Sequence, residues 1–582
     1  MGYVLGLGGP YYHDASACLV DHHGAIVAFV EEERLTRRKH NKNSRSCSQS
    51  AAFCLAAAGI GLQDVSEIAV AWNPQWPVPA DYVTNGDLIG ELLNPEFFPG
   101  GLPSRLTIIE HHLAHAASAF YLSGFSESAV MVVDGAGDGA STSLYHGASS
   151  GLKLLRKYPY TQSLGWFYET VAEHIGLGDW TSTGKLMGLA GYGQPTYDFD
   201  FLRADGDDGY VLDLARYGLS ATLDMSEAND HLPYYRQLKR AYGAAFADLG
   251  VAARRPARRY DLATGRTPVV TEFSPEQINL ASSAQFTLEQ CQLELARAAM
   301  NETGSSRLCV AGGVGLNCSS NGFLFRNSGA ADMFIQPVAG DAGCAIGAAL
   351  ECVRRAGNLA IPGAPMSSAA WGPTFTDADI AAILKSLQIG HTYYGDAICG
   401  RVARALAGGG VVGWFQGPAE AGPRALGRRS ILADPRSAAT RDRINRDIKR
   451  REMWRPLAPS ILYEAAPKFM GHSRMAEFMI VAHRATDEAA AAIPATVHVD
   501  GSLRPQTVRE SVDPRYAELI RKFDAETGVP AVLNTSFNHE AEPIVCTPID
   551  ALRTFFSTPM DALALGGFLI VKQDADSSAF AR

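Results

Sequence analysis

Two histidines in this chain have a spacing that suits a metal ion. His111 and His115 stand four residues apart in HHLAHAASAFYL, which follows the apolar run LTIIE. On a helix, residues four apart project from one face, so both imidazoles can bind the same ion. Two histidines that lie on a helix surface or cap its N-terminus are the alternative interpretation of this motif alone.

Two aspartates favour the metal interpretation. Asp134 in VVDGAG and Asp341 in VAGDAG each end an apolar strand at a glycine turn, where carboxylates gather at one edge of a sheet. Two histidines with one or two aspartates and open coordination positions suit Fe(II), manganese or zinc acting as a Lewis acid. The sequence therefore predicts a divalent metal site at these residues.

Positively charged residues are densest in the C-terminal part, among glycines and prolines. They occur in GPRALGRRSIL and RINRDIKRREMWRPLAPS, and RPQTVRE and LNTSFN follow. Long cations in rigid, apolar surroundings are typical of an anion-binding site, whereas a solvated basic helix face is the alternative. Together these segments resemble a small α/β domain that binds carbamoyl phosphate or bicarbonate and a nucleotide in one basic cavity. The candidate residues are Arg424, Lys449, Arg455, Arg504, Asn534 and Ser536.

Two glycine-containing loops could hold a phosphate, but neither matches an established motif. GGVGLN, residues 312–317, leaves backbone amides accessible to a phosphate or ribose, but it does not match GxGxxG. In STGKLMG, Leu186 stands where a P-loop requires Ser or Thr, so a Walker A motif is excluded. Taken alone, each loop is better explained as a structural turn.

The elements that must position these residues recur along the chain. YVLGLGG, ASACLVD and AIVAFVEEE are typical of three strands separated by turns, and AVMVVDGAGDG followed by STSLYHG repeats this unit. The repeat predicts a duplicated α/β architecture, as in actin-like and sugar-kinase-like nucleotide-binding folds. We also predict helices over 278–300 and 344–355, a linker boundary near residue 365, and a substrate-shaped insertion within 185–275.

Composition and charge exclude several protein classes. The 582 residues are 47% apolar and 19% charged, which is ordinary for a globular protein of about two to four domains. The net charge of −10 without a long basic run argues against general nucleic-acid binding. None of the ten cysteines forms a CxxC pair. Cys18, Cys54, Cys309 and Cys344 lie in apolar or glycine-rich segments, which predicts buried, reduced thiols there. No apolar stretch reaches 18 residues and no signal peptide is recognisable, so we expect a cytoplasmic protein.

A series of short motifs carries a resemblance to a known family. In chain order they are EEERLTRRKH, HHLAHAASAFY, VVDGAGDG, SLGWFYE, GKLMGLAGYG, AGGVGLN, GPRALGRRSIL, WRPLAPS, RPQTV and LNTSFN. This series resembles the O-carbamoyltransferase family, which makes carbamate esters on aminoglycoside, cephem and ansamycin antibiotics and on nodulation factors. The match runs from residue 4 to about 570, and GPRALG and WRPLAPS are especially specific.

The resemblance implies an α/β protein of two domains. A duplicated actin-like (ASKHA) domain over 1–364 would resemble the tRNA threonylcarbamoyladenosine transferase, and a smaller α/β, YrdC-like domain over 365–582 would resemble threonylcarbamoyl-AMP synthase. The C-terminal domain is expected to form carbamoyl-AMP from carbamoyl phosphate and ATP. The N-terminal domain would then transfer the carbamoyl group to a hydroxyl of a secondary metabolite at the metal site.

By motif position, the resemblance also implies four sets of site residues. The metal ligands fall on His111, His115, Asp134 and Asp341. Carbamoyl-adenylate contacts in the N-terminal domain fall on Lys39, Gly165, Lys185, Gly313 and Asn317. Contacts of ATP and carbamoyl phosphate fall on Arg424, Lys449, Arg455, Arg504, Asn534 and Ser536. The acceptor-side pair is His13 and Asp14, with His13 as a base for the hydroxyl or, alternatively, as a turn residue.

The implied partners are carbamoyl phosphate, ATP with Mg²⁺ and a natural-product alcohol, without nucleic acid or membrane; a homodimer is allowed. Fe(II) is the expected metal, with manganese or zinc as alternatives. Residues 195–275, together with Tyr11 and Tyr12, are expected to determine the acceptor. Whether that acceptor is an aminoglycoside, a macrolide, an ansamycin or another alcohol stays open.

Other functions compete with O-carbamoyl transfer. An actin-like small-molecule kinase would explain the glycine loops but would leave the HxxxH pair and the basic C-terminal domain without a role. A tRNA-modifying carbamoyl transferase is disfavoured by the net charge of −10 and the lack of a basic surface stripe. A non-enzymatic metal-binding scaffold would not explain two separate polyanion sites.

Overall fold

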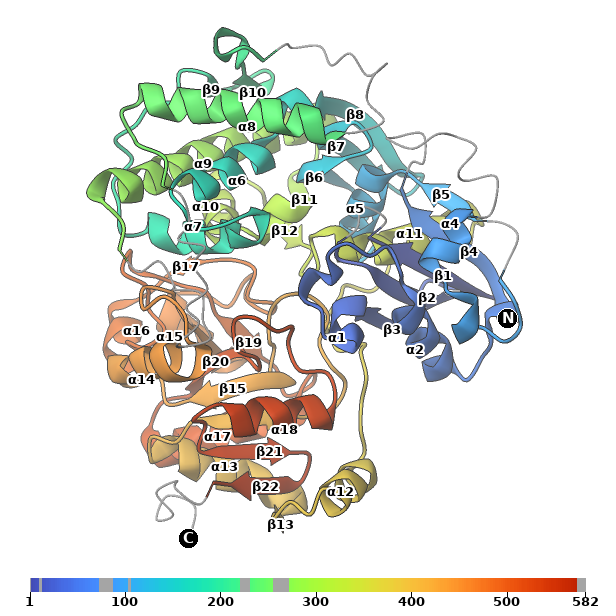
Figure 1. Ribbon diagram of the computed structural model, residues 1–582, viewed down its shortest axis with the longest axis vertical. Helices are drawn as coiled ribbons and strands as arrows, with labels where there is room; N and C mark the ends of the chain where they lie inside the picture. Colours follow the sequence, from blue (N-terminus) through green and yellow to red (C-terminus); the bar gives the residue numbers. More distant parts are fainter. Residues whose placement is uncertain are drawn as a thin grey trace. The chain divides into compact units, whose positions relative to one another are not determined.

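The computed structural model describes residues 2–9, 13–72, 87–102, 106–219, 231–254 and 272–572 (Figure 1). Two compact units make up the chain, the first from Met1–Ala28 and Asn43–Met366 and the second from Phe29–Lys42 and Ser367–Arg582. Residues 29–42 therefore belong to the same unit as the C-terminal residues, which the sequence did not indicate. Tyr11, Tyr12 and parts of 195–275, where we expect acceptor specificity, lie outside the described residues.

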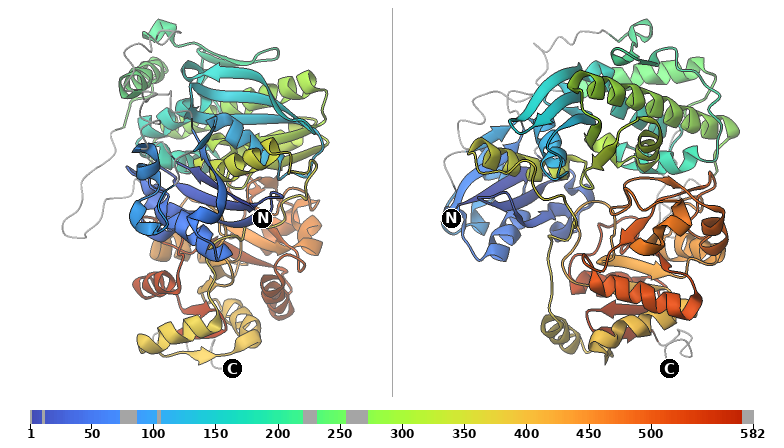
Figure 2. Two further views of the ribbon diagram at one scale, coloured as in Figure 1. Left: turned by 90° about the vertical axis from the view of Figure 1, so that its right-hand side faces the viewer. Right: turned by 180° about the vertical axis from the view of Figure 1, so that it is seen from behind.

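Two five-stranded sheets form the framework of the first unit (Figure 2). The first sheet contains β1 (Tyr3–Gly8), β2 (Ser16–Asp21), β3 (Ile26–Glu31), β4 (Val65–Ala71) and β5 (Thr107–Ile109), in the order β3-β2-β1-β4-β5. The second contains β6 (Ser128–Gly137), β7 (Ala140–Ala148), β8 (Gly151–Pro159), β11 (Arg307–Ala311) and β12 (Asp332–Ile335), in the order β8-β7-β6-β11-β12.

The two sheets repeat one topology. In the first sheet β2 is antiparallel to β1, β4 is parallel to β1 and β5 is parallel to β4. In the second sheet β7 is antiparallel to β6, β11 is parallel to β6 and β12 is parallel to β11. This repeat is the duplicated actin-like architecture, so the fold class predicted for the N-terminal part is confirmed.

Two helices fill the space between these sheets. α5 (His111–Phe120) follows β5 of the first sheet but packs on β6 and β11 of the second. α11 (Cys344–Arg355), which was predicted over the same residues, follows β12 of the second sheet but packs on β1 and β4 of the first. The two helices approach so closely that a Cβ atom at Gly347 would lie 1.8 Å from the Ala114 carbonyl oxygen. This contact joins the two halves of the first unit.

A layer of helices covers the other face of the second sheet. α9 (Pro275–Thr303) contains the helix predicted over 278–300, and it packs on β6 and β11. Its first turn is fixed by a capping box in which the side chains of Ser274 and Gln277 exchange hydrogen bonds with each other's backbone amides. The other helices here are α6 (Leu164–His174), α7 (Thr183–Ala190), α8 (His231–Asp248) and α10 (Cys318–Asn327).

The second unit is built on one mixed eight-stranded sheet, the smaller α/β domain that was predicted. The order is β13-β22-β21-β14-β15-β20-β16-β19. These strands are β13 (Thr392–Tyr393), β14 (Val412–Phe415), β15 (Arg429–Ala433), β16 (Ala458–Leu462), β19 (Gln506–Val508), β20 (Ala531–Ser536), β21 (Ala562–Leu565) and β22 (Phe568–Val571). The largest helices around it are α12 (Asp377–Ser386), α13 (Ile398–Ala407), α17 (Pro514–Thr527) and α18 (Pro548–Ser557).

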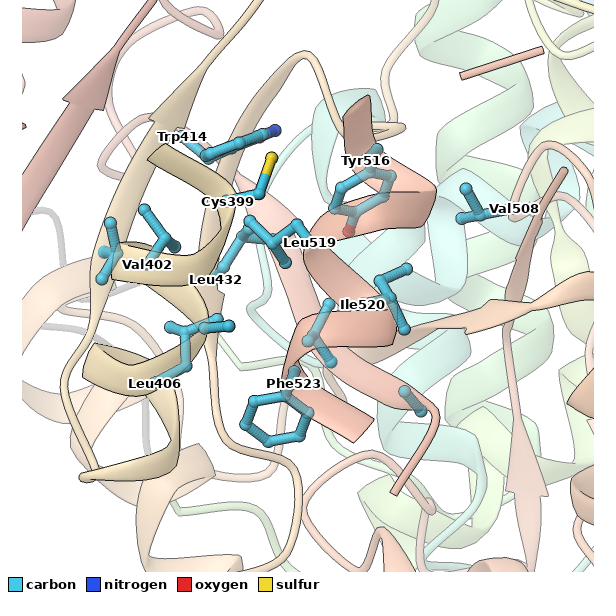
Figure 3. Close-up of a cluster of buried hydrophobic side chains, with 14 of the residues drawn as sticks. Cys399, Val402, Leu406, Trp414, Leu432, Val508, Tyr516, Leu519, Ile520 and Phe523 are labelled. Atoms are coloured by element: carbon cyan, nitrogen blue, oxygen red, sulfur yellow. The ribbon is translucent and has the colours of Figure 1, made fainter. Parts of the chain in front are cut away.

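The core of this unit lies between the sheet and the pair α13 and α17 (Figure 3). Val402 and Leu406 of α13 and Leu519 and Phe523 of α17 project toward one another, and Trp414 of β14 closes the cluster. All five side chains are fully buried. Because each large apolar side chain contributes about 1.5–3 kcal/mol when it is fully buried, this cluster stabilises the packing of the two helices on the sheet.

Two further expectations concern thiols and membranes. All ten cysteines are buried and unpaired, which confirms the prediction made for Cys18, Cys54, Cys309 and Cys344. Within the described residues, no helix has the length and apolar character needed to cross a bilayer.

The close contact between α5 and α11 makes Gly347 sensitive to substitution. Gly347→Ala would place a methyl group against the Ala114 carbonyl oxygen and 2.9 Å from the Ser118 nitrogen. We therefore expect the free energy of unfolding to fall by about 1–3 kcal/mol, which thermal or denaturant unfolding measures. Gly243→Ala is the matched control, because this glycine of α8 has no atom within 4 Å of the added carbon. Equal stability of the two variants would contradict a tight contact at Gly347.

Candidate metal centre and anion site

Four ligand atoms meet in the first unit. The Nε2 atoms of His111 and His115 lie 3.1 Å apart, and the Asp134 Oδ2 atom lies 3.3 Å and 3.7 Å from them. The Asp341 Oδ1 atom lies 3.6 Å from both. All four residues are buried, with at most 8% of their surface exposed. The structure therefore brings together the four residues that the sequence predicted as ligands.

The position of each ligand follows from the local fold. α5 begins directly after its cap residue Glu110, whose carboxylate accepts a hydrogen bond from the Leu113 amide, so both histidines project from its first turns. Asp134 lies in β6, beside α5, and Asp341 starts the short turn that leads into α11. The crossing of α5 and α11 thus assembles the site from both sheets.

The donor set fits a divalent transition metal. Ligands at about 2.0–2.2 Å from one ion are separated from one another by roughly 3–3.5 Å, and the observed separations are close to this range. Two imidazoles and two carboxylates match the preferences of Fe(II), manganese and zinc. The fit does not distinguish between these metals.

The electrostatics of the cluster also favour a cation. Burial alone would raise the pKa of Asp134, but its contacts with His111 and His115 hold that pKa well below the usual value. Burial lowers the pKa of His115, and its contacts with the Asp134 and Asp341 carboxylates outweigh this and raise the pKa to about 9. The two carboxylates therefore impose a negative potential at the point where the ligand atoms converge.

Neighbouring groups fix the ligands in place. The Gly313 amide donates to the Asp134 Oδ1 atom at 2.9 Å, and the His111 amide donates to the Asp138 carboxylate at 2.6 Å. The Cys344 Sγ atom lies 4.0 Å from the His111 Nδ1 atom. Such supporting contacts orient metal ligands and tune their basicity. From the sequence, Cys344 is predicted only as a buried thiol, because its proximity to His111 depends on the packing of α11.

His13 and Asp14 lie beside this cluster. The His13 Nδ1 atom is 3.2 Å from Asp14 and 3.8 Å from Asp341, and its ring lies 4.8 Å from that of Trp180. Desolvation lowers the pKa of His13, but the bond to Asp14 and the charge of Asp341 outweigh it and raise the pKa to about 9. A divalent cation held by Asp341 would oppose that increase. The role of His13 as a base stays a prediction.

The residues expected to contact carbamoyl adenylate are distributed over both units. A Cβ atom at Gly165 would approach the Asp134 carbonyl oxygen to 2.6 Å, so α6 packs directly on this strand. Asn317 follows the loop of Gly313 and caps α10 by accepting a hydrogen bond from Ser320. Lys185 lies on α7. Lys39 lies in the second unit, where its amino group donates to the Glu540 carbonyl at 2.7 Å.

Several cations converge in the second unit. The desolvated ammonium of Lys449 has its pKa held well below the usual value by burial first, and then by Arg451, Lys39 and Arg455. Arg451 is affected in the same way by desolvation, Arg455 and Arg504. Like charges gathered in this way are typical of a site that binds an anion. Of the basic side chains chosen from the sequence, Lys449, Arg455 and Arg504 lie close to one another or to Arg451.

Asn534 and Ser536, two of the polar residues expected at this site, form hydrogen bonds with other groups of the protein. The buried Asn534 amide group donates to the Ala425 carbonyl and to the Ser460 hydroxyl, at 3.1 Å and 2.9 Å. The Lys449 ammonium donates to the Ser536 hydroxyl and carbonyl oxygens and to Asn538. These contacts organise the strand ends around the cations, and direct binding of a ligand by Asn534 and Ser536 stays a prediction.

Two arginines of the basic segments, Arg428 and Arg429, are bound by groups of the protein. The fully buried Arg429 guanidinium donates to the carbonyls of Gln416, Gly417 and Pro373 and stacks on Phe415 at 3.6 Å. Arg428 forms an ion pair with Asp513 at 3.0 Å. The structural explanation therefore holds for these two residues. Arg451 belongs to the basic segment RINRDIKRREMWRPLAPS that the sequence indicated, but it was not among the residues predicted to contact a ligand.

Family models match both parts of the chain. The model described as Carbamoyltransferase N-terminus matches residues 3–77 and 102–350. The model described as Carbamoyltransferase C-terminus matches residues 403–572. The first contains all four clustered ligands, and the second contains the basic residues of β15 to β20.

Relatives agree with these matches. The nodulation protein NolNO of Sinorhizobium fredii is 36% identical over 99% of this chain and 82% of its own length. The 3'-hydroxymethylcephem-O-carbamoyltransferase of Amycolatopsis lactamdurans is 36% identical over 47% of this chain and 50% of its own. Among solved structures, HypF of T. kodakarensis has a TM-score of 0.31 and 15% identity over 62% of this chain and 48% of its own; that likeness is too weak to inform the fold. The chain belongs to the carbamoyltransferase family.

Proposed function

We propose that this carbamoyltransferase is an ATP-dependent O-carbamoyltransferase of secondary metabolism. The second unit would form carbamoyl adenylate from carbamoyl phosphate and ATP, with release of phosphate and pyrophosphate. The first unit would then pass the carbamoyl group to a hydroxyl of a natural-product alcohol. The observation that supports this proposal best is the presence, in one chain, of a buried cluster of two histidines and two aspartates and of a separate convergence of cations.

The cation cluster suits the formation of the adenylate. ATP and carbamoyl phosphate carry several negative charges, and bringing them together requires cations that are already in place. Lys449 is held by four oxygen atoms of Ser536 and Asn538, so its charge is fixed in position. Arg424, Arg455 and Arg504 are half-buried and would supply bidentate contacts to phosphate groups.

The buried ligand cluster suits the transfer step. His111, His115, Asp134 and Asp341 would hold a divalent metal, which supplies Lewis-acid stabilisation of the leaving phosphate when it is bound. His13, beside Asp341, would accept the proton of the acceptor hydroxyl once its own proton has been lost. Asp14 would keep the imidazole oriented through the 3.2 Å contact to Nδ1. Gly165 and Gly313 approach Asp134 closely, because an added Cβ atom would lie 2.6 Å from its carbonyl oxygen and 2.9 Å from its Oδ1 atom, respectively.

A metal content measurement tests the ligand cluster. His115→Ala removes one of the four buried ligands and leaves only three to hold the ion. We therefore expect loss of both the bound metal and carbamoyl transfer. Elemental analysis of the purified chain should find close to one divalent transition metal in the wild type. His146→Ala is the control, because the side chain of this histidine of β7 is bonded to Glu127, which does not belong to the ligand cluster. Full transfer activity in a metal-free chain would contradict the assignment.

The two half-reactions should separate by mutation. Lys449→Met removes a fixed charge, and loss of one such clamp reduces a rate on the order of 10²–10³-fold. We expect this loss in pyrophosphate release, with transfer from supplied carbamoyl adenylate retained. His13→Ala should show the converse, with transfer reduced roughly 10²–10⁴-fold. Lys385→Met on α12 is the control. If both variants lose the same half-reaction, the division of chemistry between the two sites is wrong.

The state of Lys449 predicts a pH dependence. Because its pKa lies well below the ordinary 10.5, the ammonium loses its proton at a lower pH than a free lysine. kcat/KM for ATP in pyrophosphate release should therefore fall as pH rises, with a midpoint below 10.5. Lys449→Arg should move that decline to higher pH, because a guanidinium keeps its charge. An alkaline limb unchanged by Lys449→Arg would exclude Lys449 as its source.

A further inference from the structure

A segment from the N-terminal part of the sequence is built into the second unit. We call residues 29–42 the strap. The Phe29 amide donates to the Trp371 carbonyl at 3.2 Å. The Arg37 guanidinium donates to the carbonyls of Ile544 and Pro543 at 2.7 Å and 2.8 Å. The strap is therefore fixed to the second unit at several points along its length.

Two side chains of the strap bind Gly422, which lies in the connection between β14 and β15. This connection also carries Arg424. The Gly422 amide donates to the Glu31 carboxylate at 2.6 Å, and the Gly422 carbonyl accepts a hydrogen bond from the Arg34 guanidinium at 2.5 Å. Glu31 and Arg34 are 7% and 2% exposed, and their charged groups lie 3.6 Å apart. Gly422 has a φ of +89°, a conformation that favours glycine. Both polar backbone groups of this residue are thus satisfied by the strap.

The other end of this connection is held from within the second unit. The buried Glu420 carboxylate accepts hydrogen bonds from the Leu426 and Arg429 amides at 2.7 Å and 3.2 Å. The Asn534 amide group donates to the Ala425 carbonyl. Arg424 therefore lies between two fixed points, with Gly422 held on one side and Ala425 on the other.

We propose that Glu31 and Arg34 are positioning residues for Arg424 and therefore for adenylate formation. This inference rests on the proposed function, in which Arg424 binds phosphate. Neither residue needs to touch a substrate. They set the backbone of Gly422, two residues before Arg424, and a guanidinium displaced by about 1 Å can lose on the order of 10²-fold in rate.

The variant that tests this role is Arg34→Met in the full-length chain. It keeps the length of the side chain but removes the donor to Gly422. We expect pyrophosphate release to fall by about 10- to 100-fold, with transfer from supplied carbamoyl adenylate unchanged. Arg34→Lys restores a donor and should recover part of the rate. Arg38→Met is the matched control, because Arg38 is an exposed residue of the same strap. Unfolding curves identify any variant whose loss comes from misfolding.

A double-mutant cycle distinguishes positioning from a purely structural role. If Arg34 acts through Arg424, Arg34→Met should cost little further activity in an Arg424→Ala background. Independent, multiplicative losses would overturn the inference, and so would full pyrophosphate release in Arg34→Met alone. The same cycle measured on the Kd for ATP gives a second test. If the wild-type chain binds ATP but releases no pyrophosphate, the proposed function is contradicted. The positioning role of Arg34 is still tested in that case, by the double-mutant cycle on the Kd for ATP. Additive effects on that Kd would overturn the inference.

Discussion

The close crossing of α5 and α11 at Gly347 is the constraint on which the first unit depends. Each of these helices follows one sheet and packs on the other, so their contact joins two halves that share one topology. His111 and His115 lie on α5, and Asp341 stands immediately before α11. A buried set of four ligands drawn from separate halves can form only if this contact is tight. The same close-packing that stabilises the fold therefore sets the spacing of the ligand atoms.

The second unit gathers charges of one sign, whereas the first unit pairs histidines with aspartates. There the cations lie close together and lower one another's pKa, which costs stability unless an anion binds. The protein offsets this cost by holding Lys449 with oxygen atoms and by stacking Arg429 on Phe415. Arg429 shows that a basic motif can serve the fold, since its guanidinium is used by backbone carbonyls. The same segment thus supplies both structural and candidate ligand-binding arginines.

The sequence predicted the features that depend on local patterns. The strand units, α9, α11 and the HxxxH spacing each occupy a short stretch, so periodicity and spacing were sufficient to find them. Asp134 and Asp341 were found because acids at strand ends recur at sheet edges. What could not be predicted depends on contacts between distant residues. The approach of Cys344 to His111 follows from the packing of α11, and the binding of Gly422 by Glu31 and Arg34 joins positions almost 400 residues apart. No local pattern carries that information.

In the proposed reaction, one chain activates a carbamoyl group as an adenylate and then transfers it. The most direct measurement supplies ATP and carbamoyl phosphate to the purified, metal-loaded chain and identifies the nucleotide and phosphate products. We expect carbamoyl adenylate or AMP as the nucleotide product, with pyrophosphate released only when carbamoyl phosphate is present. Formation of ADP with a phosphorylated small molecule, or pyrophosphate release that does not depend on carbamoyl phosphate, would contradict it.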